Sequence, residues 1–557
     1  MWLWRVIIAW MKDDFFVDEF SPEEKEVLRP FCTNLDRSIF GLRNLPEVVK
    51  GALFSRYSRT DKSLRRVLLD EFINEPEMGF SEIVGFAKSQ GEDQMVATQK
   101  AEEFYDRVLV GYGDDSVAEL GSAHIAIENV THVATKFMED SRIGLDPLEK
   151  STRYVYYDEK VNGKYKFYRP ADIMQSEFAK DYEDYLNLLF ETYSEWRKPM
   201  RKMIKAKFPQ DPETTDRAYK STVKAKVCDS LRPLLPVGTV TNMGFFGNGR
   251  AFEYLLLKMF ASDFQEVCDI AEVMNKELNK LIPSFVKRAN NERGQATQKY
   301  LRDTRAKVKE LAEKFVSVTN TQNEPQVTLV DYDQDAENKI AADIIFANKE
   351  VSLAKAHEIA KKLSGEEKTE LLNAYSGARQ NRFHRPGRAF EETFYTFEVV
   401  ADINAFRDIH RHRMLTQERQ PYTTAHGFIT PPEIIEAGTV DEYKKIMSQA
   451  HDLYQKIAPQ FPHSAQYLVP MGYLIRWRMK MNLREAYHLL ELRSVPQGHP
   501  TYRKIAQDMY LAIKKIHPLL AEGIQFVDMS EKDELERLGA EKKIDKKLET
   551  VKEKYGN

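Results

Sequence analysis

An internal repeat constrains this chain more than any other feature of its sequence. Residues 111–154 and 385–424 are two diverged copies of one segment, at an offset of about 270 residues. A second pair follows: LRPLLP with NGRAFEYLLLKMF (231–260) matches AQYLVP with NLREAYHLLELR (465–493). Because the spacing inside this second pair is the same in both copies, the sequence predicts a tandem duplication resembling a fused dimer.

The two offsets differ by about 36 residues, so the first half is expected to carry an insertion within 158–227, a polar and helix-rich stretch. We predict a first module at 1–321, a second at 322–529 and a charged tail at 530–557, an exposed helix or frayed end. Between the modules, 290–317 is typical of a solvent-rich helix. TNTQNEP is expected to be a linker, and VTLVDY has the alternation of a strand.

Composition excludes several classes of protein. A net charge of -4 and a pI near 6.4 argue against a nucleic-acid polymer as partner. Three widely separated cysteines without a Cys-x-x-Cys pair indicate a reducing cytoplasm and no thiolate zinc site. The initial MWLWRVIIAWMKDDFF is a weak match to a targeting signal, because its apolar run is short, is interrupted by Arg5 and lacks a small-residue cleavage site. It is expected to be a buried strand or helix.

Arg411, His412 and Arg413 form the densest cationic triplet, preceded by Arg407 and His410. In an extended segment the two outer arginines would share a face and suit a planar or phosphate-bearing anion. In a helix they would diverge and simply be solvated. A metal site at the two histidines is disfavoured because no further ligand follows at a suitable spacing, so no metal is predicted.

Glu149, Ser151 and Arg153 place an acceptor, a hydroxyl and a cation at alternate positions, followed by Tyr154. An extended loop would direct the first three at one phosphate or base edge and turn the tyrosine away. The alternative is a salt-bridged turn without a ligand.

Asn-x-Arg opens an apolar run in both halves, at Asn248 and Arg250 and at Asn482 and Arg484. The periodicity predicts helices whose asparagine either caps the N-terminus or faces a ligand phosphate. Arg493 ends the later run and is expected either to reach solvent or to bind a ligand. Glu119 and Glu391 occupy matched positions, as caps or as ligand groups.

Together these motifs resemble the flavin-dependent thymidylate synthases, which carry R-H-R-x-x-S-x-N-E-x-S-x-R-Y, then Arg-x-x-Leu-Pro, Asn-x-Arg and a final arginine. The late copy has the first triplet but continues with Thr416, Glu418, Arg419, Pro421, Thr423 and Thr424. The early copy replaces the triplet with Ser141, Arg142 and Ile143 but keeps Glu149, Ser151, Arg153 and Tyr154. Arg232 of the early half aligns with Gln466 of the late half, and Arg493 of the late half aligns with Met259 of the early half.

The resemblance implies an α+β fold of two tandem modules, each a mixed sheet flanked by helices. It implies FAD as cofactor, NADPH and methylenetetrahydrofolate as co-substrates, and a homodimer that forms a pseudo-tetramer. It assigns FAD binding to Arg411, His412, Arg413, Glu391, Asn482, Arg484, His488, Asn248 and Arg250. It assigns dUMP binding to Glu149, Ser151, Arg153, Arg232 and Arg493, the last also stabilising charge on the uracil as the catalytic residue.

Under this hypothesis the phosphate-side residues lie in the early half and the flavin-side residues in the late half. No cysteine nucleophile is required, because the flavin and the folate supply the chemistry. Two alternatives stay open: an inactive flavin- or nucleotide-binding protein, and a flavin-dependent methyl- or hydroxymethyltransferase acting on another pyrimidine. The site is complete only if groups from the two halves meet.

Overall fold

The computed structural model describes residues 18–36, 39–58, 60–74, 119–316, 325–531 and 535–556. The initial MWLW segment, 111–118 of the first repeat and most of the linker lie outside these residues. Two compact units contain the described chain. The first comprises Met1–Glu128, Phe137–Leu148 and Met243–Ser317, and the second Asn129–Lys136, Glu149–Asn242 and Val318–Asn557. The predicted module boundaries, 1–321, 322–529 and 530–557, stay predictions.

The elements of the first repeat lie mostly in the first unit, together with short N-terminal helices. In chain order they are α2 (Pro22–Leu28), α3 (Glu47–Tyr57), α4 (Leu64–Val67), η1 (Leu68–Ile73), β1 (Ser122–Thr131), α7 (His132–Glu139), β2 (Leu145–Glu149), β5 (Val240–Asn248), α11 (Gly249–Phe260), α12 (Gln265–Leu281), α13 (Pro283–Val286), η6 (Lys287–Ala289) and α14 (Glu292–Phe315).

The second unit holds the inserted helices and the second repeat. Its elements are β3 (Lys160–Val161), β4 (Lys164–Tyr165), α8 (Ala171–Met174), α9 (Ala179–Lys207), α10 (Asp216–Leu231), η5 (Arg232–Leu234), β6 (Val327–Tyr332), α15 (Ala336–Asn348), α16 (Leu353–Lys362), α17 (Gly365–Ser376), η7 (Arg388–Glu391), β7 (Phe394–Asp402), α18 (Ile403–Ile409), β8 (Leu415–Arg419), α19 (Pro432–Glu436), α20 (Val440–Ile457), η8 (Ser464–Leu468), β9 (Leu474–Asn482), α21 (Leu483–Arg493), α22 (Pro500–Ile516), α23 (Pro518–Glu522) and α24 (Leu538–Tyr555).

The duplication predicted from sequence is confirmed by element order. The first repeat runs β1, α7, β2, then β5, α11 and α12, with strand order β1-β5-β2. The second runs β7, α18, β8, then β9, α21 and α22, with strand order β7-β9-β8 and β6 added at the edge. β2 and β8 share one burial pattern, which makes Arg419 the counterpart of Glu149. The α+β prediction is therefore correct.

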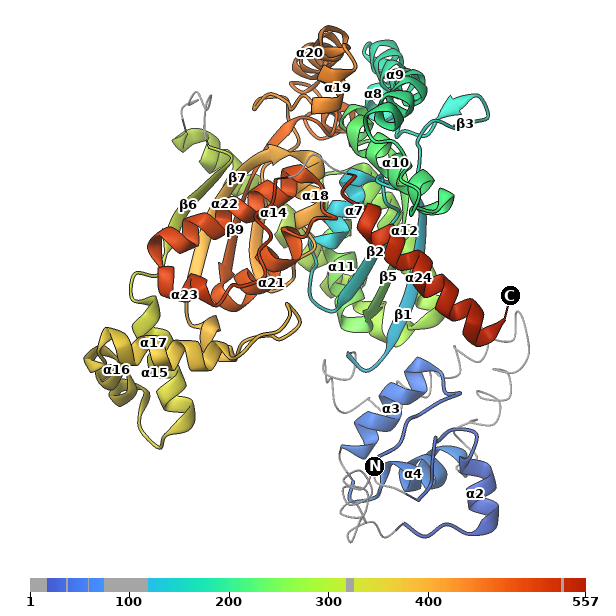
Figure 1. Ribbon diagram of the computed structural model, residues 1–557. Coiled ribbons are helices and arrows are strands. Elements are labelled where there is room, and N and C mark those ends of the chain that lie inside the picture. Colours follow the sequence, from blue (N-terminus) through green and yellow to red (C-terminus); the bar gives the residue numbers. More distant parts are fainter. Residues whose placement is uncertain are drawn as a thin grey trace. The chain divides into compact units, whose positions relative to one another are not determined.

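Strict alternation along β7 and β9 builds the core of the second unit. Tyr395 pairs with Met481 and Val399 with Trp477 in the antiparallel register, and these side chains point inward. The intervening polar residues of β9 point outward. Helix α22 crosses this sheet and buries its own apolar face, including Ile505 (Figure 1).

The proline-ended segments of the two repeats hydrogen-bond to each other within the second unit. Val237 N donates to Val469 O and Met471 N to Leu235 O, each over 2.9 Å. Gly238 N donates to Tyr467 O and Gly472 N to Pro233 O, again over 2.9 Å. Each pair relates the same two repeat positions with the partners exchanged, as in a twofold interface between identical subunits.

The insertion forms helices, as predicted. α9 and α10 pack on each other, α9 also contacts α20, and α10 contacts α24. Lys226 on α10 bonds Glu433 over 2.8 Å and Glu536 over 2.9 Å. The charged tail therefore forms helix α24, whose Glu541 is buried and bonds Arg217 on α10.

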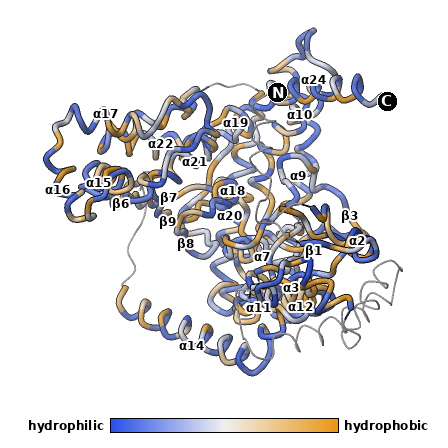
Figure 2. Tube along the Cα trace, turned by 90° about the horizontal axis from the view of Figure 1, so that it is seen from below, coloured by the Kyte–Doolittle hydropathy of each residue, from blue (hydrophilic) through white to orange (hydrophobic). Residues whose placement is uncertain are grey.

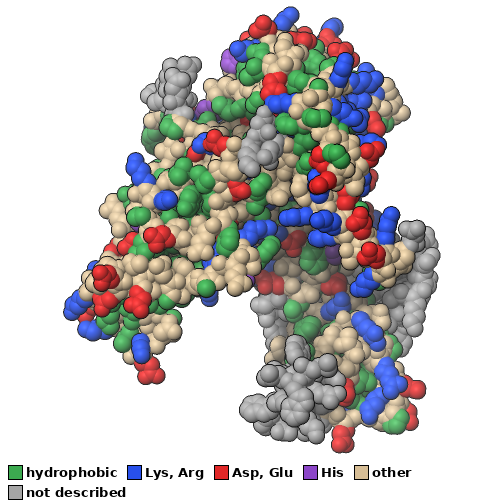
Figure 3. Space-filling model, viewed as in Figure 1, with side chains coloured by type: hydrophobic (Ala, Val, Ile, Leu, Met, Phe, Trp, Pro, Cys, Tyr) green, Lys and Arg blue, Asp and Glu red, His purple; other side chains and the backbone are tan. Residues whose placement is uncertain are grey.

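The prediction of a solvent-rich helix before the linker is confirmed by α14, which buries only Gly294 and Gln298 among its residues and mixes hydrophilic with hydrophobic positions (Figure 2). VTLVDY is confirmed as strand β6. Lys and Arg side chains are interspersed with Asp and Glu on the face drawn in Figure 3. Among the described residues, no helix combines the length and apolar character that a bilayer crossing requires.

Candidate active site

A buried carboxylate joins the two repeats inside the second unit. Glu149 ends β2, and Arg407 on α18 donates to its Oε1 over 3.0 Å. His132, the first residue of α7, and Lys136, in its last turn, lie 2.7 and 2.9 Å from the same carboxylate. Burial opposes ionisation of Glu149, but the surrounding cations outweigh it and hold its pKa well below the usual range. Burial lowers the pKa of His132 to about 4, so its imidazole is neutral.

Two buried arginine–aspartate pairs lie beside this carboxylate. Arg153 forms a fork with Asp229, with Nε to Oδ1 at 2.9 Å and Nη2 to Oδ2 at 2.7 Å. Arg232 Nη2 donates to Asp408 Oδ2 over 3.1 Å. Although burial opposes ionisation of Asp408, Arg232, Arg153 and Arg411 depress its pKa. Both arginines predicted to bind phosphate are therefore already paired with acids.

The sequence prediction of an extended Glu149–Tyr154 loop is only partly correct. Glu149 is the last residue of a strand, but Thr152 to Tyr154 form a turn. Ser151 Oγ accepts from Arg153 N over 3.1 Å, so it orders the turn. Tyr154 turns outward as expected, where its hydroxyl and ring contact Arg537. The local structure is the salt-bridged turn considered as the alternative.

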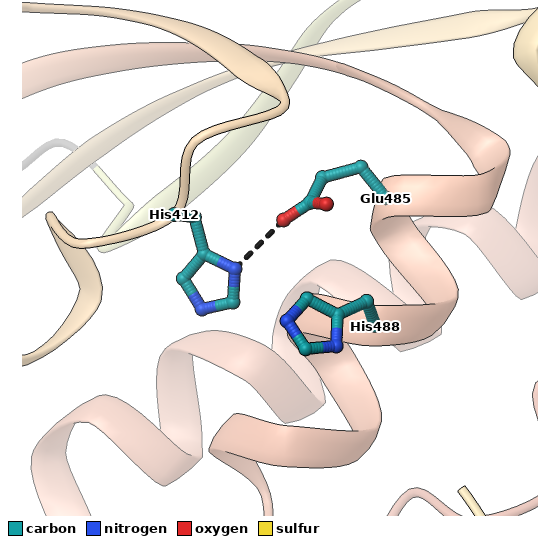
Figure 4. Close-up of side chains that lie close together, drawn as sticks. All are labelled: His412, Glu485 and His488. Carbon is teal, nitrogen blue, oxygen red and sulfur yellow. Dashed lines mark hydrogen bonds and ion pairs between the residues drawn. The ribbon is translucent and has the colours of Figure 1, made fainter. Parts of the chain in front are cut away.

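The cationic triplet lies in the turn between α18 and β8. Arg411 and Arg413 are exposed and His412 is buried, so the alternation expected of an extended segment holds. Arg493 Nε donates to His412 Nε2 over 2.9 Å, and His412 Nδ1 lies 2.7 Å from Glu485 Oε1 (Figure 4). Because Nε2 accepts, the imidazole proton resides on Nδ1 and is donated to the carboxylate.

Burial sets the charge states of His412, His488 and Glu485. It lowers the pKa values of His412, which Arg493 and Arg411 depress further, and of His488. It raises the pKa of Glu485 to about 7, although His488, Arg385 and Arg493 oppose the rise. The carboxyl of Glu485 is thus the group of this cluster poised to exchange a proton near neutral pH.

His412, Glu485 and His488 are close enough to hold a metal ion, with ligand atoms within 4.8 Å of one another. The chemistry of the set favours a different role. Both His412 nitrogens are engaged, and Arg493 and Arg385 place positive charge beside the cluster. A cationic surrounding disfavours a divalent cation and suits an anionic ligand.

The Asn-x-Arg motifs cap helices in both repeats, as one predicted alternative required. Asn248 Oδ1 accepts from Ala251 N and Asn482 Oδ1 from Glu485 N, each over 2.8 Å. The arginines pair with the matched glutamates: Arg250 with Glu119 at 2.9 Å, and Arg484 with Glu391 at 2.7 Å. The Oδ1 atom of each capping asparagine already accepts a hydrogen bond. A contact of these amides with a flavin would therefore be made by their Nδ2 groups.

The structure collects most predicted site residues in the second unit and leaves Asn248 and Arg250 in the first. Sequence reasoning missed the two aspartates and Glu485. The sequence did offer one signal for Asp229: it lies three residues before Arg232, a spacing at which an acid and an arginine on a helix can pair. Asp408 likewise lies three residues before Arg411, but no sequence signal links it to Arg232.

The three cysteines are confirmed as unpaired. Cys32, Cys228 and Cys268 are free thiols. Burial raises the pKa of Cys228 to about 12, so its thiol is protonated and a poor nucleophile.

Comparison with known proteins supports the resemblance. A family model described as Thymidylate synthase complementing protein matches the chain twice, at residues 75–284 and 328–519. A UPF0159 protein of Chlamydia muridarum is 43% identical over 92% of this chain and 97% of its own length. Similar proteins from Chlamydia pneumoniae and Thermoplasma acidophilum are 41% and 34% identical, over 94% and 88% of this chain and 98% and 97% of their own lengths.

A solved structure, a UMP/dUMP methylase from Streptomyces cacaoi bound with 5-Br dUMP, is 18% identical and aligns with a TM-score of 0.29 over 37% of this chain and 97% of that chain. The family match covers both repeats, each with its own set of elements. The chain therefore belongs to the thymidylate synthase complementing family, the flavin-dependent thymidylate synthases, and carries the family domain twice.

Proposed function

We propose that this protein methylates dUMP reductively to dTMP, with methylenetetrahydrofolate as carbon donor, NADPH as reductant and FAD as cofactor. Membership of the family supports a methyltransferase role on a dUMP-like nucleotide. One observation carries the proposal: charged residues of the two repeats meet in one compact unit. Arg407 bonds Glu149, and Arg232 bonds Asp408. Neither repeat holds this set alone.

The cations beside His412 fit an anionic dinucleotide. Arg411 is exposed and makes no hydrogen bond with any residue in the described part of the chain, so its donors are available. Arg385 and Arg493 act electrostatically on the half-buried His488. Arg411, Arg413 and His488 would hold the FAD, and the chemistry that it supplies when bound is hydride donation.

The chain's own contribution is binding and charge stabilisation. Arg493 is held at its Nε by His412, which Glu485 fixes in turn. A guanidinium oriented in this way stabilises negative charge that develops on a pyrimidine ring during attack. Burial of the cluster excludes water and strengthens this interaction.

The test is spectroscopic and chemical. Purified protein is expected to show a flavin spectrum that NADPH bleaches, and to release the C5 proton of dUMP when methylenetetrahydrofolate is added. Arg411→Ala should lose the flavin, whereas Arg478→Ala, at an exposed position on β9, should retain it. Protein that cannot be reconstituted with FAD would refute the proposal.

A second candidate is the same chemistry on another pyrimidine. It is favoured by the late copy's departure from the family motif at Glu418, Arg419, Pro421, Thr423 and Thr424. Mass spectrometry of products from a panel of uracil- and cytosine-containing ligands distinguishes the two. Flavin binding without turnover of any ligand would instead indicate an inactive binding protein.

A further inference from the structure

The first unit holds a cavity of its own, with a volume of about 510 Å³. That volume lies in the range of pockets that bind small organic ligands. Its lining residues come from the turn before β2, from α11, from η6 and from the start of α14. The first family match ends at residue 284, so η6 and α14 lie outside it and this chain builds part of the cavity from its own connecting segment.

Three arginines line the cavity together with two glutamates, so the lining carries a net positive charge. Arg250 on α11 pairs with Glu119 at 2.9 Å, and Arg288 Nε donates to Glu253 over 3.1 Å. Arg293, in the first turn of α14, is exposed, and its guanidinium makes no ion pair or hydrogen bond with any residue that the structure describes. Its donors are therefore available to an anion.

The pair between Arg250 and Glu119 can open to a ligand at small cost. Both side chains are 53% exposed, and exposed ion pairs contribute little to stability. A phosphate that replaced Glu119 would form stronger, forked bonds with the guanidinium. Helices α11 and α14 both begin at the cavity, and their N-terminal ends add positive potential to that of the arginines.

An aromatic ring lines the same cavity. Tyr254 is 57% exposed and lies four residues after Arg250 on α11, so the ring and the guanidinium share one face of the helix. Lys258 Nζ lies 5.0 Å from the centroid of this ring, and a base would stack on the opposite face. Stacking on an aromatic side chain is available to every nucleobase, because each has a π-face.

The cavity lies at the repeat position of the cluster around His412, with the groups of that cluster replaced. In the alignment of the repeats, Ala251 takes the place of Glu485 and Tyr254 that of His488. A small side chain and a ring thus line the cavity where the second repeat has a carboxyl and an imidazole. The duplicated position has exchanged its hydrogen-bonding groups for a surface that suits stacking.

We propose that this cavity binds a nucleoside monophosphate, in addition to the ligands of the second unit. Arg250 and Arg293 bind the phosphate, and the base stacks on Tyr254. Binding replaces one ion pair by another and involves no covalent step. The proposal goes beyond methylation of dUMP, because no step of that reaction uses this cavity.

The experiment is calorimetric titration of AMP, adenosine and inorganic phosphate into the full-length chain saturated with FAD and dUMP, which occupy the site proposed in the second unit. AMP is expected to bind with one equivalent per chain, about tenfold or more tightly than adenosine or phosphate. Arg293→Ala should weaken AMP binding by about tenfold and leave adenosine unchanged, whereas Tyr254→Ala should weaken both.

The matched control is Lys309→Ala, at an exposed position further along α14, which removes the same charge as Arg293→Ala. It should leave the affinities for all three ligands unchanged. Arg293 and Tyr254 are themselves exposed, so their variants are expected to keep the thermal midpoint of the native protein.

The outcomes separate this proposal from the proposed function. Equal affinities for AMP and adenosine, or an unchanged AMP affinity in Arg293→Ala, would overturn the phosphate contact and with it the proposal. Phosphate binding as tight as that of AMP would refute the stacked base. If FAD and dUMP fail to bind, the proposed function is wrong, and the dependence of AMP binding on Arg293 and Tyr254 is then measured in the ligand-free chain.

Discussion

At the scale of single residues, Glu149 is the counter-ion of a buried cationic cluster. Glu149→Gln keeps the volume but removes the carboxylate that Lys136 and Arg407 both bond. Removing one partner of a buried ion pair costs about 3–5 kcal/mol, so the urea midpoint should fall sharply. Asp508→Asn, which breaks an exposed pair with Lys504, should cost about 0–1 kcal/mol. Equal losses would contradict the role of Glu149.

The raised pKa of Glu485 leads us to expect that the free energy of unfolding depends on pH. Its folded pKa of about 7 lies above the unfolded value of 4.5, so the folded state binds more protons between those values. The free energy of unfolding therefore falls as the pH rises through this window. Glu485→Gln removes the effect, so the variant should gain on the order of 1–3 kcal/mol relative to the native protein between pH 4.5 and 7.5.

That gain is measured at each pH as the free energy of unfolding of the variant minus that of the native protein, each from a denaturation curve. The subtraction cancels the contributions of titratable groups that both proteins share. The matched control is Glu442→Gln, at an exposed position in the first turn of α20. A constant difference across the pH range for Glu485→Gln would rule out the raised pKa.

At the scale of elements, the crossing of the two proline-ended segments leaves no room for a side chain at Gly238. A Cβ added at Gly238 would lie 2.7 Å from Tyr467 O, a backbone atom that cannot rotate away. Gly238→Ala should destabilise the fold by about 1–3 kcal/mol in thermal denaturation. Gly365→Ala at the start of α17 meets nothing within 4 Å and should be neutral or stabilising. Similar effects at both positions would contradict this account.

The elements themselves were largely predictable. Period-3.6 apolar runs after Asn248 and Asn482 became α11 and α21, and the alternation of VTLVDY became β6. The caps were predictable because an asparagine amide satisfies free N–H groups wherever a helix begins. The turn at Thr152–Tyr154 was less predictable, since its conformation depends on long-range partners of Arg153.

At the scale of the whole molecule, five of the residues that we propose for the site occur in only one of the two repeats. The repeat positions of Arg411, His412 and Arg493 hold Ser141, Arg142 and Met259, and those of Arg153 and Arg232 hold Thr423 and Gln466. We therefore expect one flavin and one nucleotide substrate per chain. The ratio of released flavin to denatured protein measures this directly, and a ratio of two would contradict it.

The oligomeric state is a separate proposal. A dimer would contain four family domains, and multi-angle light scattering would give twice the 64.7 kDa of the chain. A mass equal to one chain would show that the two tandem domains suffice.

The sequence by itself determined the repeat, the family and the helices and strands, because these follow from local spacing and periodicity. It also predicted the arginines that we propose for the site. Only the tertiary structure decided which acids neutralise them: Arg232 and Asp408 are far apart along the chain yet lie 3.1 Å apart in space. Burial then fixed their charge states, and burial is a property of the whole packed unit rather than of any segment.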